Sequence, residues 1–336
     1  MTRRAWALVL CWVVLGGIAC SRRSTLPLAL NDREFWSLSE ALSEPAGAFP
    51  LSDNLLSNEP AVAENVRRLP RGSGVYIGVG PEQNFSYIAG MRPAMAFIID
   101  IRRENRSLHL LYKALFELSI DRADFVSRLF SRWRPAGLSS SAGVDEIFTR
   151  YADAPPSPEL FASNRTLVRE RLLTTRGLPL SQADLDWIDR VFKAFYDAGP
   201  EIKFWGSSDV DAVQPTYRWL MTAKDMLGLN RSYLASETGY RFVRDLQLKN
   251  LIVPVVGDFG GPSAIRRVGN YVREHHDVVH AFYGSNVAVY LNNQQTRAYC
   301  ASLETLPRES RRTWFVERDG VRLLDSKLKD CSSKAK

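Results

Sequence analysis

Short apolar runs and helical stretches follow one another along this chain from residue 74 onward. The first run, 74–80, is rich in β-forming residues and ends in Gly78 and Gly80. Pro81 and Glu82 come next, and these residue types suit the first turn of a helix. We therefore predict a strand, a glycine turn and a helix in this order.

A second apolar run, 95–100, ends in a carboxylate, Asp100. From Arg102 to Leu118 the apolar residues recur three and four positions apart, which predicts a helix. Strands and helices that alternate in this way are typical of a doubly wound parallel sheet, in which helices cover both faces.

A long helical block, 120–248, interrupts the strand pattern. Its segments with a helical period are 124–130, 144–151, 159–173, 181–196, 216–227 and 232–246. Ser181 precedes Asp184 by three residues, which is the spacing of a capping box, and 203–206 is a candidate short strand. We expect the block to be an insertion or lid over the sheet and not an independent domain.

The strand pattern returns after this block. The apolar run 251–258 contains Pro254, which predicts a bulge or an edge strand because proline cannot donate to the ladder. A further strand is expected at 278–283, and a closing hairpin at 313–324 turns at 319–320. The pattern as a whole predicts an α/β fold with a doubly wound, mostly parallel, Rossmann-like sheet, an antiparallel C-terminal hairpin and a large helical insertion.

Residues 1–19 have the features of an export signal. Two arginines precede an uncharged run, 5–19, which is too short to span a bilayer comfortably. The sequence Gly-Ile-Ala-Cys at 17–20 resembles a bacterial lipobox, in which Cys20 becomes the lipidated first residue. We expect an exported protein that this lipid anchors to a membrane of the bacterial envelope. The alternatives are simple cleavage after residue 19 into the periplasm, an uncleaved anchor, or a wrong start codon.

Three further regions complete the organisation. Residues 20–70 are broken by prolines and predict a linker and an irregular lead-in. One short helix, capped by Asn31 or Asp32, is expected there, and such a segment packs across a core and carries no chemistry. Residues 71–326 form a single domain, and 327–336 a polar, frayed tail.

Cysteine usage agrees with export. Cys11 leaves with the signal, and Cys20 is consumed if it is lipidated. Cys300 and Cys331 remain, and they either close a C-terminal loop through a disulfide in an oxidising compartment or are two unrelated thiols. No Cys-x-x-Cys occurs, so we predict neither a cysteine-based zinc site nor a thioredoxin-type redox site.

Composition and charge exclude several classes of protein. The 336 residues are 45% hydrophobic and 24% charged, which excludes a disordered or collagen-like chain. The net charge of +7 is spread along the chain without a polybasic arm. This charge is the one feature in favour of nucleic-acid binding, and export argues against that function. His276 and His280 have a helical metal-site spacing, but the strand pattern begins between them, so no metal site is predicted. The motifs of serine hydrolases, P-loop NTPases and zinc proteases do not occur in the sequence.

The ends of the predicted strands carry the candidate site. Ligands of open α/β sheets bind outside the carboxyl ends of the strands, where glycines let them approach the backbone and helix starts offer free N–H groups. Asp100 stands 20 residues after Gly80, near the separation at which a carboxylate accepts from a ribose hydroxyl, so a nucleoside-like ligand would fit. The alternative is that the glycines only permit a tight turn and close helix packing. The candidate ligand-binding residues are Gly78, Gly80, Glu82, Gln83, Asn84, Asp100, Arg102, Asn105 and Asp258.

A group of arginines, Arg102, Arg103 and Arg106, follows the second strand. These side chains either grip an anionic ligand or form ordinary ion pairs on the helix surface.

At these residues the sequence resembles the S-adenosylmethionine-dependent methyltransferase superfamily. More narrowly, it resembles a bacterial family of uncharacterised, often exported proteins with a methyltransferase-like fold. The segments that carry the resemblance are 76–84, 95–105, 258–267 and 282–291. The resemblance implies S-adenosylmethionine as the cofactor, with Gly78 and Gly80 at its methionine end and Asp100 on its ribose.

Three functions remain open on the sequence. An exported domain folds where S-adenosylmethionine is not expected to be supplied, so the first hypothesis is a non-catalytic envelope protein that binds a ligand or a partner. The alternative is a methyltransferase acting on a small molecule, with Asp100 as ribose acceptor. Glu82, Asn84 or Asp258 would then lie near the transferred group. An enzyme without a recognised motif is the third, and the sequence identifies no catalytic residue, substrate or oligomeric state.

Overall fold

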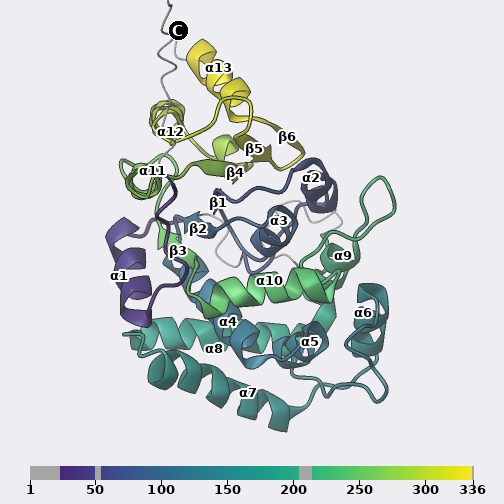
Figure 1. The fold of residues 1–336 in the computed structure, drawn as a ribbon. Coiled ribbons are helices and arrows are strands. Elements are labelled where there is room, and N and C mark those ends of the chain that lie inside the picture. The colour runs from purple at the N-terminus through teal and green to yellow at the C-terminus, as the bar shows by residue number, and fades with distance from the viewer. Residues whose placement is uncertain (1–22, 50–53, 204–213, 335–336) are drawn as a thin grey trace, which may run out of the picture.

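The fold is built around one six-stranded sheet. A computed structural model describes residues 23–49, 54–203 and 214–334 (Figure 1). The strand order is β3-β2-β1-β4-β5-β6, in which β1 to β5 run parallel and β6 is antiparallel to β5. This arrangement confirms the predicted fold class. The strands are β1 (Val75–Gly78), β2 (Met95–Asp100), β3 (Ile252–Val256), β4 (Val279–Ser285), β5 (Trp314–Glu317) and β6 (Gly320–Leu323).

Helices cover both faces of the sheet (Figure 1). Those on one side are α3 (Gln83–Met91), α4 (Arg103–Leu118) and α10 (Glu237–Leu248), and those on the other are α11 (Ala264–Glu274) and α12 (Asn293–Glu304). Burial on both faces explains why β1, β2 and β3 are continuous apolar runs without alternation. Because β2 lies on one side of β1 and β4 on the other, the strand order reverses between β1 and β4.

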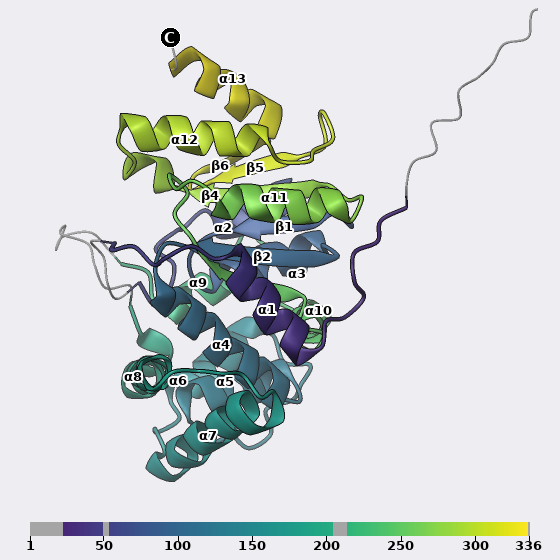
Figure 2. The same cartoon turned by 90° about the vertical axis from the view of Figure 1, so that its left-hand side faces the viewer.

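The helical insertion packs on α4. Every residue of α4 from Asn105 to Glu117 is buried, because the sheet covers one side of this helix and the insertion covers the other. Figure 2 shows the insertion helices α5 to α8 on the far side of α4 from the strands. The insertion helices are α5 (Arg122–Phe130), α6 (Val144–Ala152), α7 (Pro158–Glu170), α8 (Gln182–Ala198) and α9 (Tyr217–Thr222).

One helix of the insertion is much shorter than its pattern predicted. The segment 216–227 was expected to be helical throughout, but α9 ends at Thr222. The side chain of Asp225 accepts hydrogen bonds from the backbone N–H groups of Leu227 at 2.9 Å and Leu229 at 3.0 Å. This competition for the backbone folds the segment into a turn, as an aspartate in a potential helix often does.

Other local predictions in the insertion have mixed outcomes. Ser181 and Asp184 form the predicted capping box at the start of α8. The helix predicted at 232–246 begins only after Ser236, whose side chain caps α10. Of the candidate strand 203–206, only Lys203 lies among the described residues, where it forms an isolated bridge.

The lead-in covers an edge of the sheet. Helix α1 (Asp32–Leu42) starts at Asn31, whose side chain forms a capping box with Glu34. Its Ser39 hydroxyl donates to the carbonyl oxygen of Pro254 at 2.5 Å, across 215 residues of sequence. Pro254 therefore sits in the edge strand β3, which is one of the two placements that its sequence position predicted.

The lead-in also caps the N-terminus of α11, the helix that follows β3. The Glu44 backbone N–H donates to the Val256 carbonyl oxygen at 2.8 Å. The Glu44 carboxylate accepts from the N–H groups of Ser263 and Ala264, both at 2.6 Å, and so satisfies free donors at the first turn of α11. A second helix, α2 (Val62–Arg68), was not predicted. Helix α1 is the one short helix that the sequence predicted at 20–70, so among the described residues of this stretch only α2 departs from the expected irregular segment.

The C-terminal residues are helical as far as Lys334, so the prediction of a frayed tail at 327–336 is wrong for 327–334, while 335 and 336 lie outside the described residues. Helix α13 (Leu324–Lys334) buries Leu328 and Cys331. Cys331 forms a disulfide with Cys300 of α12, which is one of the two alternatives that the sequence left open. The covalent bond and the buried leucine together hold a polar helix that its sequence alone would not predict.

Candidate functional site

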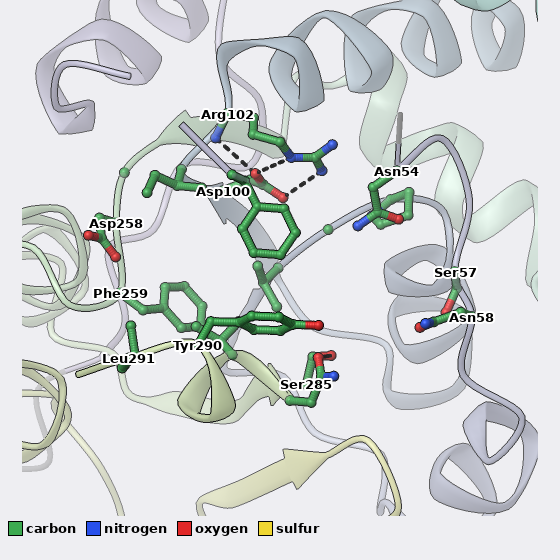
Figure 3. A pocket seen from close by; sticks show the side chains of 18 of the residues that line it. Asn54, Ser57, Asn58, Asp100, Arg102, Asp258, Phe259, Ser285, Tyr290 and Leu291 are labelled. Carbon is green, nitrogen blue, oxygen red and sulfur yellow. Dashed lines mark hydrogen bonds and ion pairs between the residues drawn. The ribbon is translucent and has the colours of Figure 1, made fainter. Parts of the chain in front are cut away.

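A cavity of about 240 Å³ opens at the carboxyl ends of β1 to β4 (Figure 3). It lies where the strand order reverses, which is the usual ligand position in open α/β sheets. Because one buried water needs roughly 10–15 Å³ of such space, the cavity has room for a small organic molecule. The segments that line it at the ends of these four strands are 79–81, 100–102, 257–259 and 285–287.

The lead-in supplies a further part of the wall, and Gln83, Tyr290, Leu291 and Gln295 supply the rest. Leu56 is fully buried and anchors this part of the chain on the core, while its polar neighbours face the cavity. These residues border the cavity, although the sequence pattern did not place them there. The lead-in residues that line the cavity are Ala48, Phe49, Asn54, Ser57, Asn58 and Glu59.

Two side chains, Asn84 and His109, form hydrogen bonds with the turn after β1. Gly80 has a φ of 77°, a conformation that glycine adopts without strain. The Asn84 amide nitrogen donates to the carbonyl oxygens of Val79 at 3.0 Å and Pro81 at 2.7 Å. His109 of α4 lies 2.9 Å from the Gly80 carbonyl oxygen through Nε2, and burial lowers the pKa of this imidazole to about 4. A neutral histidine therefore donates to the turn at neutral pH.

Gly78 serves packing at this site. A Cβ atom at this position would lie 2.0 Å from Oδ1 of Asn84 and 2.7 Å from the Tyr76 hydroxyl. No larger residue fits there without displacing the asparagine that holds the turn. For Gly78 the geometry agrees with the packing alternative, whereas Gly80 lines the cavity.

Asp100 and Arg102 form a buried ion pair on the cavity wall (Figure 3). Arg102 Nε lies 3.1 Å from Oδ1 and Nη2 lies 3.1 Å from Oδ2 of the carboxylate. The backbone N–H of Arg102 donates to Oδ1 at 2.9 Å as well. Both oxygens of Asp100 are thus already bonded, and the charge of Arg102 is neutralised.

Glu82 lies behind this wall. Its two carboxylate oxygens are each 3.1 Å from the backbone nitrogen of Ser57, so it ties the lead-in to the start of α3. The side chain is completely buried, and this burial raises the pKa of Glu82 to about 8, although the Ser57 N–H lowers it. Glu82 is therefore protonated at neutral pH.

The structure brings five of the nine candidate residues to the cavity. The residues that line it are Gly80, Gln83, Asp100, Arg102 and Asp258. The other four, Gly78, Glu82, Asn84 and Asn105, are not part of the lining. Sequence reasoning missed the lead-in residues, although polar residues on either side of a Leu-Leu pair at 55–56 are a signal that the segment touches the core.

Comparison with known proteins gives a family. A family model described as "Domain of unknown function (DUF7790)" matches residues 55–175 and 182–313. The chain belongs to this family. No curated protein matches the chain. The part of the chain that matches the DUF7790 model contains all four strands whose ends form the cavity, together with the lead-in residues from Leu55 to Glu59.

The arginines that follow β2 in the DUF7790 domain have structural partners. Arg103 donates to both carboxylate oxygens of Asp184 on α8, at 2.8 Å and 2.7 Å, and so joins α4 to the insertion. Arg106 pairs with Glu40 of α1. These two contacts agree with the ion-pair alternative. Within the ranges that the structure describes, no three histidine, cysteine, aspartate or glutamate side chains gather in a way that could hold a metal ion.

Proposed function

We propose that the protein is an exported, lipid-anchored protein of the bacterial envelope that binds a small polar molecule without transforming it. The cavity between the ends of β1 to β4 carries this proposal. It combines apolar walls with side chains from four strand ends and the lead-in, which is the composition of ligand sites in general. A site assembled from segments so far apart in the sequence supports a role in binding.

The expected location outside the cytoplasm favours binding over methyl transfer, because S-adenosylmethionine is not expected to be supplied there. Residues 1–22, which include the signal and Cys20, lie outside the described residues. The disulfide between Cys300 and Cys331 supports export, because such bonds persist in oxidising compartments. No helix in the described part of the chain has the length and apolar character needed to cross a bilayer.

The lipid anchor has a direct test. Cys20→Ser is expected to abolish membrane association, because the serine cannot carry the lipid. Fractionation of cells into membrane and soluble material measures this. Cys11→Ser is the matched control, since Cys11 leaves with the signal, and it should leave the protein in the membrane fraction. An unchanged distribution of the Cys20→Ser protein would refute the anchor.

The binding role is tested by filling the cavity. Val287 lines the cavity from a short 3₁₀ helix, Val287–Val289, while Val289 points away and is 78% exposed. We expect Val287→Trp to abolish ligand binding and Val289→Trp to leave it unchanged. Calorimetry with a panel of amines, polyols, nucleosides and carboxylates measures the result. If the wild-type protein binds no member, or both variants bind equally, the proposal fails.

A second candidate is an S-adenosylmethionine-dependent methyltransferase acting on a small molecule. Two observations favour it: the strand order with its antiparallel hairpin, and the presence of Gly80 and Asp100 on one cavity. Titration with S-adenosylmethionine and S-adenosylhomocysteine separates the two functions. Binding that is lost in both Asp100→Ala and Val287→Trp would support the methyltransferase, and no binding to well-folded wild-type protein would remove it.

A further inference from the structure

The N-terminal segment, residues 23–30, joins the domain at one edge of the sheet. The Thr25 backbone N–H donates to the His275 carbonyl oxygen at 2.8 Å, and the Leu30 N–H donates to the Lys249 carbonyl oxygen at 2.9 Å. The two acceptors directly follow α11 and α10, so they lie just before β4 and β3. This is the edge at which the parallel strands begin, which we call the amino edge, and Leu26 and Leu30 pack against the core.

The cavity opens at the opposite edge, at the carboxyl ends of β1 to β4. Strand β2 has six residues, and each residue of a parallel strand advances about 3.3 Å, so the two edges are about 20 Å apart. Figure 2 shows the N-terminal segment, in purple, on the right-hand side beside the end of α11. The segment and the cavity are therefore separated by the full depth of the sheet.

A lipid on Cys20 would hold the amino edge close to a membrane. Cys20 comes five residues before Thr25, and five fully extended residues span at most about 18 Å. The lipid itself lies in the bilayer, so Thr25 can be no further from the bilayer surface than this span. Because the sheet is about 20 Å deep, the segment is too short for the cavity edge to face the same membrane.

The amino edge is basic. The N-terminal segment and the residues just before β1 to β4 carry two carboxylates, Glu274 and Asp277, against five cations: Arg23, Arg71, Arg92, Lys249 and Arg273. The segment before β5, 307–313, adds three arginines and one glutamate, and two of these arginines are ion-paired. A surface with this excess of positive charge attracts anionic headgroups.

Two details of the amino edge favour contact with lipid. Burial lowers the pKa of the Arg92 guanidinium, and the charge of Arg71 lowers it further. An external anion would relieve the repulsion between these two cations. Leu28 of the N-terminal segment is 89% exposed, and an apolar side chain among cations is typical of surfaces that bind the interface of a bilayer.

The cavity edge differs in charge. The lining of the cavity contains three carboxyl groups, Glu59, Asp100 and Asp258, and one cation, Arg102. An anionic bilayer is not attracted to such a surface. Charge therefore favours the same orientation as the short N-terminal segment does.

We infer that the amino edge of the sheet rests on a bilayer of anionic phospholipids, with Arg23, Arg71 and Lys249 at the headgroups and Leu28 at the boundary of the acyl chains. This inference rests on the proposed lipid anchor and gives the anchored domain an orientation. The cavity then faces away from the membrane and takes its ligand from the aqueous side.

Fluorescence quenching in vesicles tests this orientation. The lipidated full chain is reconstituted into vesicles of phosphatidylcholine and phosphatidylglycerol that contain a lipid with a spin-labelled headgroup. A fluorophore is attached through Glu274→Cys at the amino edge or through Val289→Cys, a position beside the cavity that is 78% exposed. We expect the probe at residue 274 to lose most of its fluorescence and the probe at residue 289 to keep nearly all of it.

Flotation of the same vesicles distinguishes the two ways in which the result can fail. If the protein does not float with the vesicles, the lipid anchor is wrong and the orientation fails with it. If the protein floats and both probes are quenched equally, or the probe at residue 289 is quenched more, the anchor stands and the orientation is overturned.

Charge variants test the contact with headgroups. Each cation near an anionic surface favours the docked state about fivefold, so Arg71→Gln combined with Lys249→Gln should lower the ratio of docked to undocked domain by about 25-fold. Quenching at residue 274 should fall accordingly, and also in vesicles of phosphatidylcholine alone. Lys193→Gln on α8 is the control, since this exposed lysine lies in the insertion, and it should leave the quenching unchanged. Circular dichroism verifies the folding of each variant. Unchanged quenching in both the double variant and the neutral vesicles would overturn the headgroup contact.

Discussion

Glu117→Gln is expected to lower the free energy of unfolding by about 3–5 kcal/mol, the cost of breaking a buried ion cluster. The Glu117 side chain has no solvent exposure and lies 2.9 Å from Lys113 Nζ and 2.9 Å from Arg176 Nη2. Lys113 is equally buried, and burial lowers the pKa of its ammonium to about 8, although the Glu117 carboxylate raises it. Without that carboxylate, two cations remain in the interior with too little counter-charge.

The loss matters for the whole architecture because the cluster joins three regions. Arg176 follows α7 in the insertion, and it also contacts Asp32 of the lead-in at 2.8 Å and the Leu248 carbonyl oxygen at the end of α10 at 3.1 Å. Chemical denaturation at pH 7, followed by circular dichroism, measures the effect. The exposed pair Lys193–Asp197 supplies the control, and Asp197→Asn should cost less than about 0.5 kcal/mol.

A double variant sharpens this prediction. Glu117→Gln combined with Lys113→Met removes the carboxylate and one of its buried cations together. The combined loss should be smaller than the sum of the two single losses, because each single change strands the other group. Additive losses, or a loss below about 1 kcal/mol in Glu117→Gln, would show that the cluster does not stabilise the fold.

Glu82→Gln is expected to stabilise the protein, and the gain should grow with pH. Burial raises the pKa of Glu82 to about 8, while the unfolded chain has the ordinary value of about 4.5. Between these two values the folded state holds a proton that the unfolded state has released, so stability falls as the pH rises. A glutamine does not titrate, and the variant should gain about 4 kcal/mol relative to wild type between pH 4 and pH 8.

The measurement is the difference in unfolding free energy between the two proteins at several pH values. Other titrating groups are common to both proteins and cancel in this difference. The difference should be near its minimum at pH 4, rise through pH 5 to 8 and level off above pH 8. A difference that does not change with pH would mean that Glu82 is ionised in the folded protein.

The strand ends of the site could be predicted because they depend on order along the chain. An alternating pattern of strands and helices fixes which ends face the same edge of the sheet, and this placed Gly80, Asp100 and Asp258 correctly on one cavity wall. The edge position of β3 was one of two placements that the sequence predicted, for a different reason: Pro254 limits its strand to an edge or a bulge.

Side chains around the start of α3 could not be assigned from the pattern. Glu82, Gln83 and Asn84 are adjacent, but only Gln83 lines the cavity, while the other two point into the interior. Nearly every residue of α3 is buried, so the helix has no polar face that would show which way each side chain turns. Amphipathicity carries that information only when one face of a helix meets water.

The sequence did not predict where the lead-in lies, because its position depends on contacts with residues far away in the sequence. Nothing near Glu59 or Asn54 in the sequence indicates that they meet the ends of β1 and β4. They are placed by α1 on the edge strand, by Glu44 on α11 and by the link from Glu82 to Ser57. These contacts join segments between 25 and 219 residues apart, where local patterns carry no information.

The contact of α1 with β3 has a consequence for the order in which the molecule forms. Ser39 reaches Pro254 across 215 residues, so a chain that emerges N-terminus first presents α1 long before its partner strand exists. Closing so large a loop is slow compared with forming local helices. Until β3 arrives, α1 has no edge strand to dock on, and the part of the lead-in that α1 positions reaches its final place late in folding.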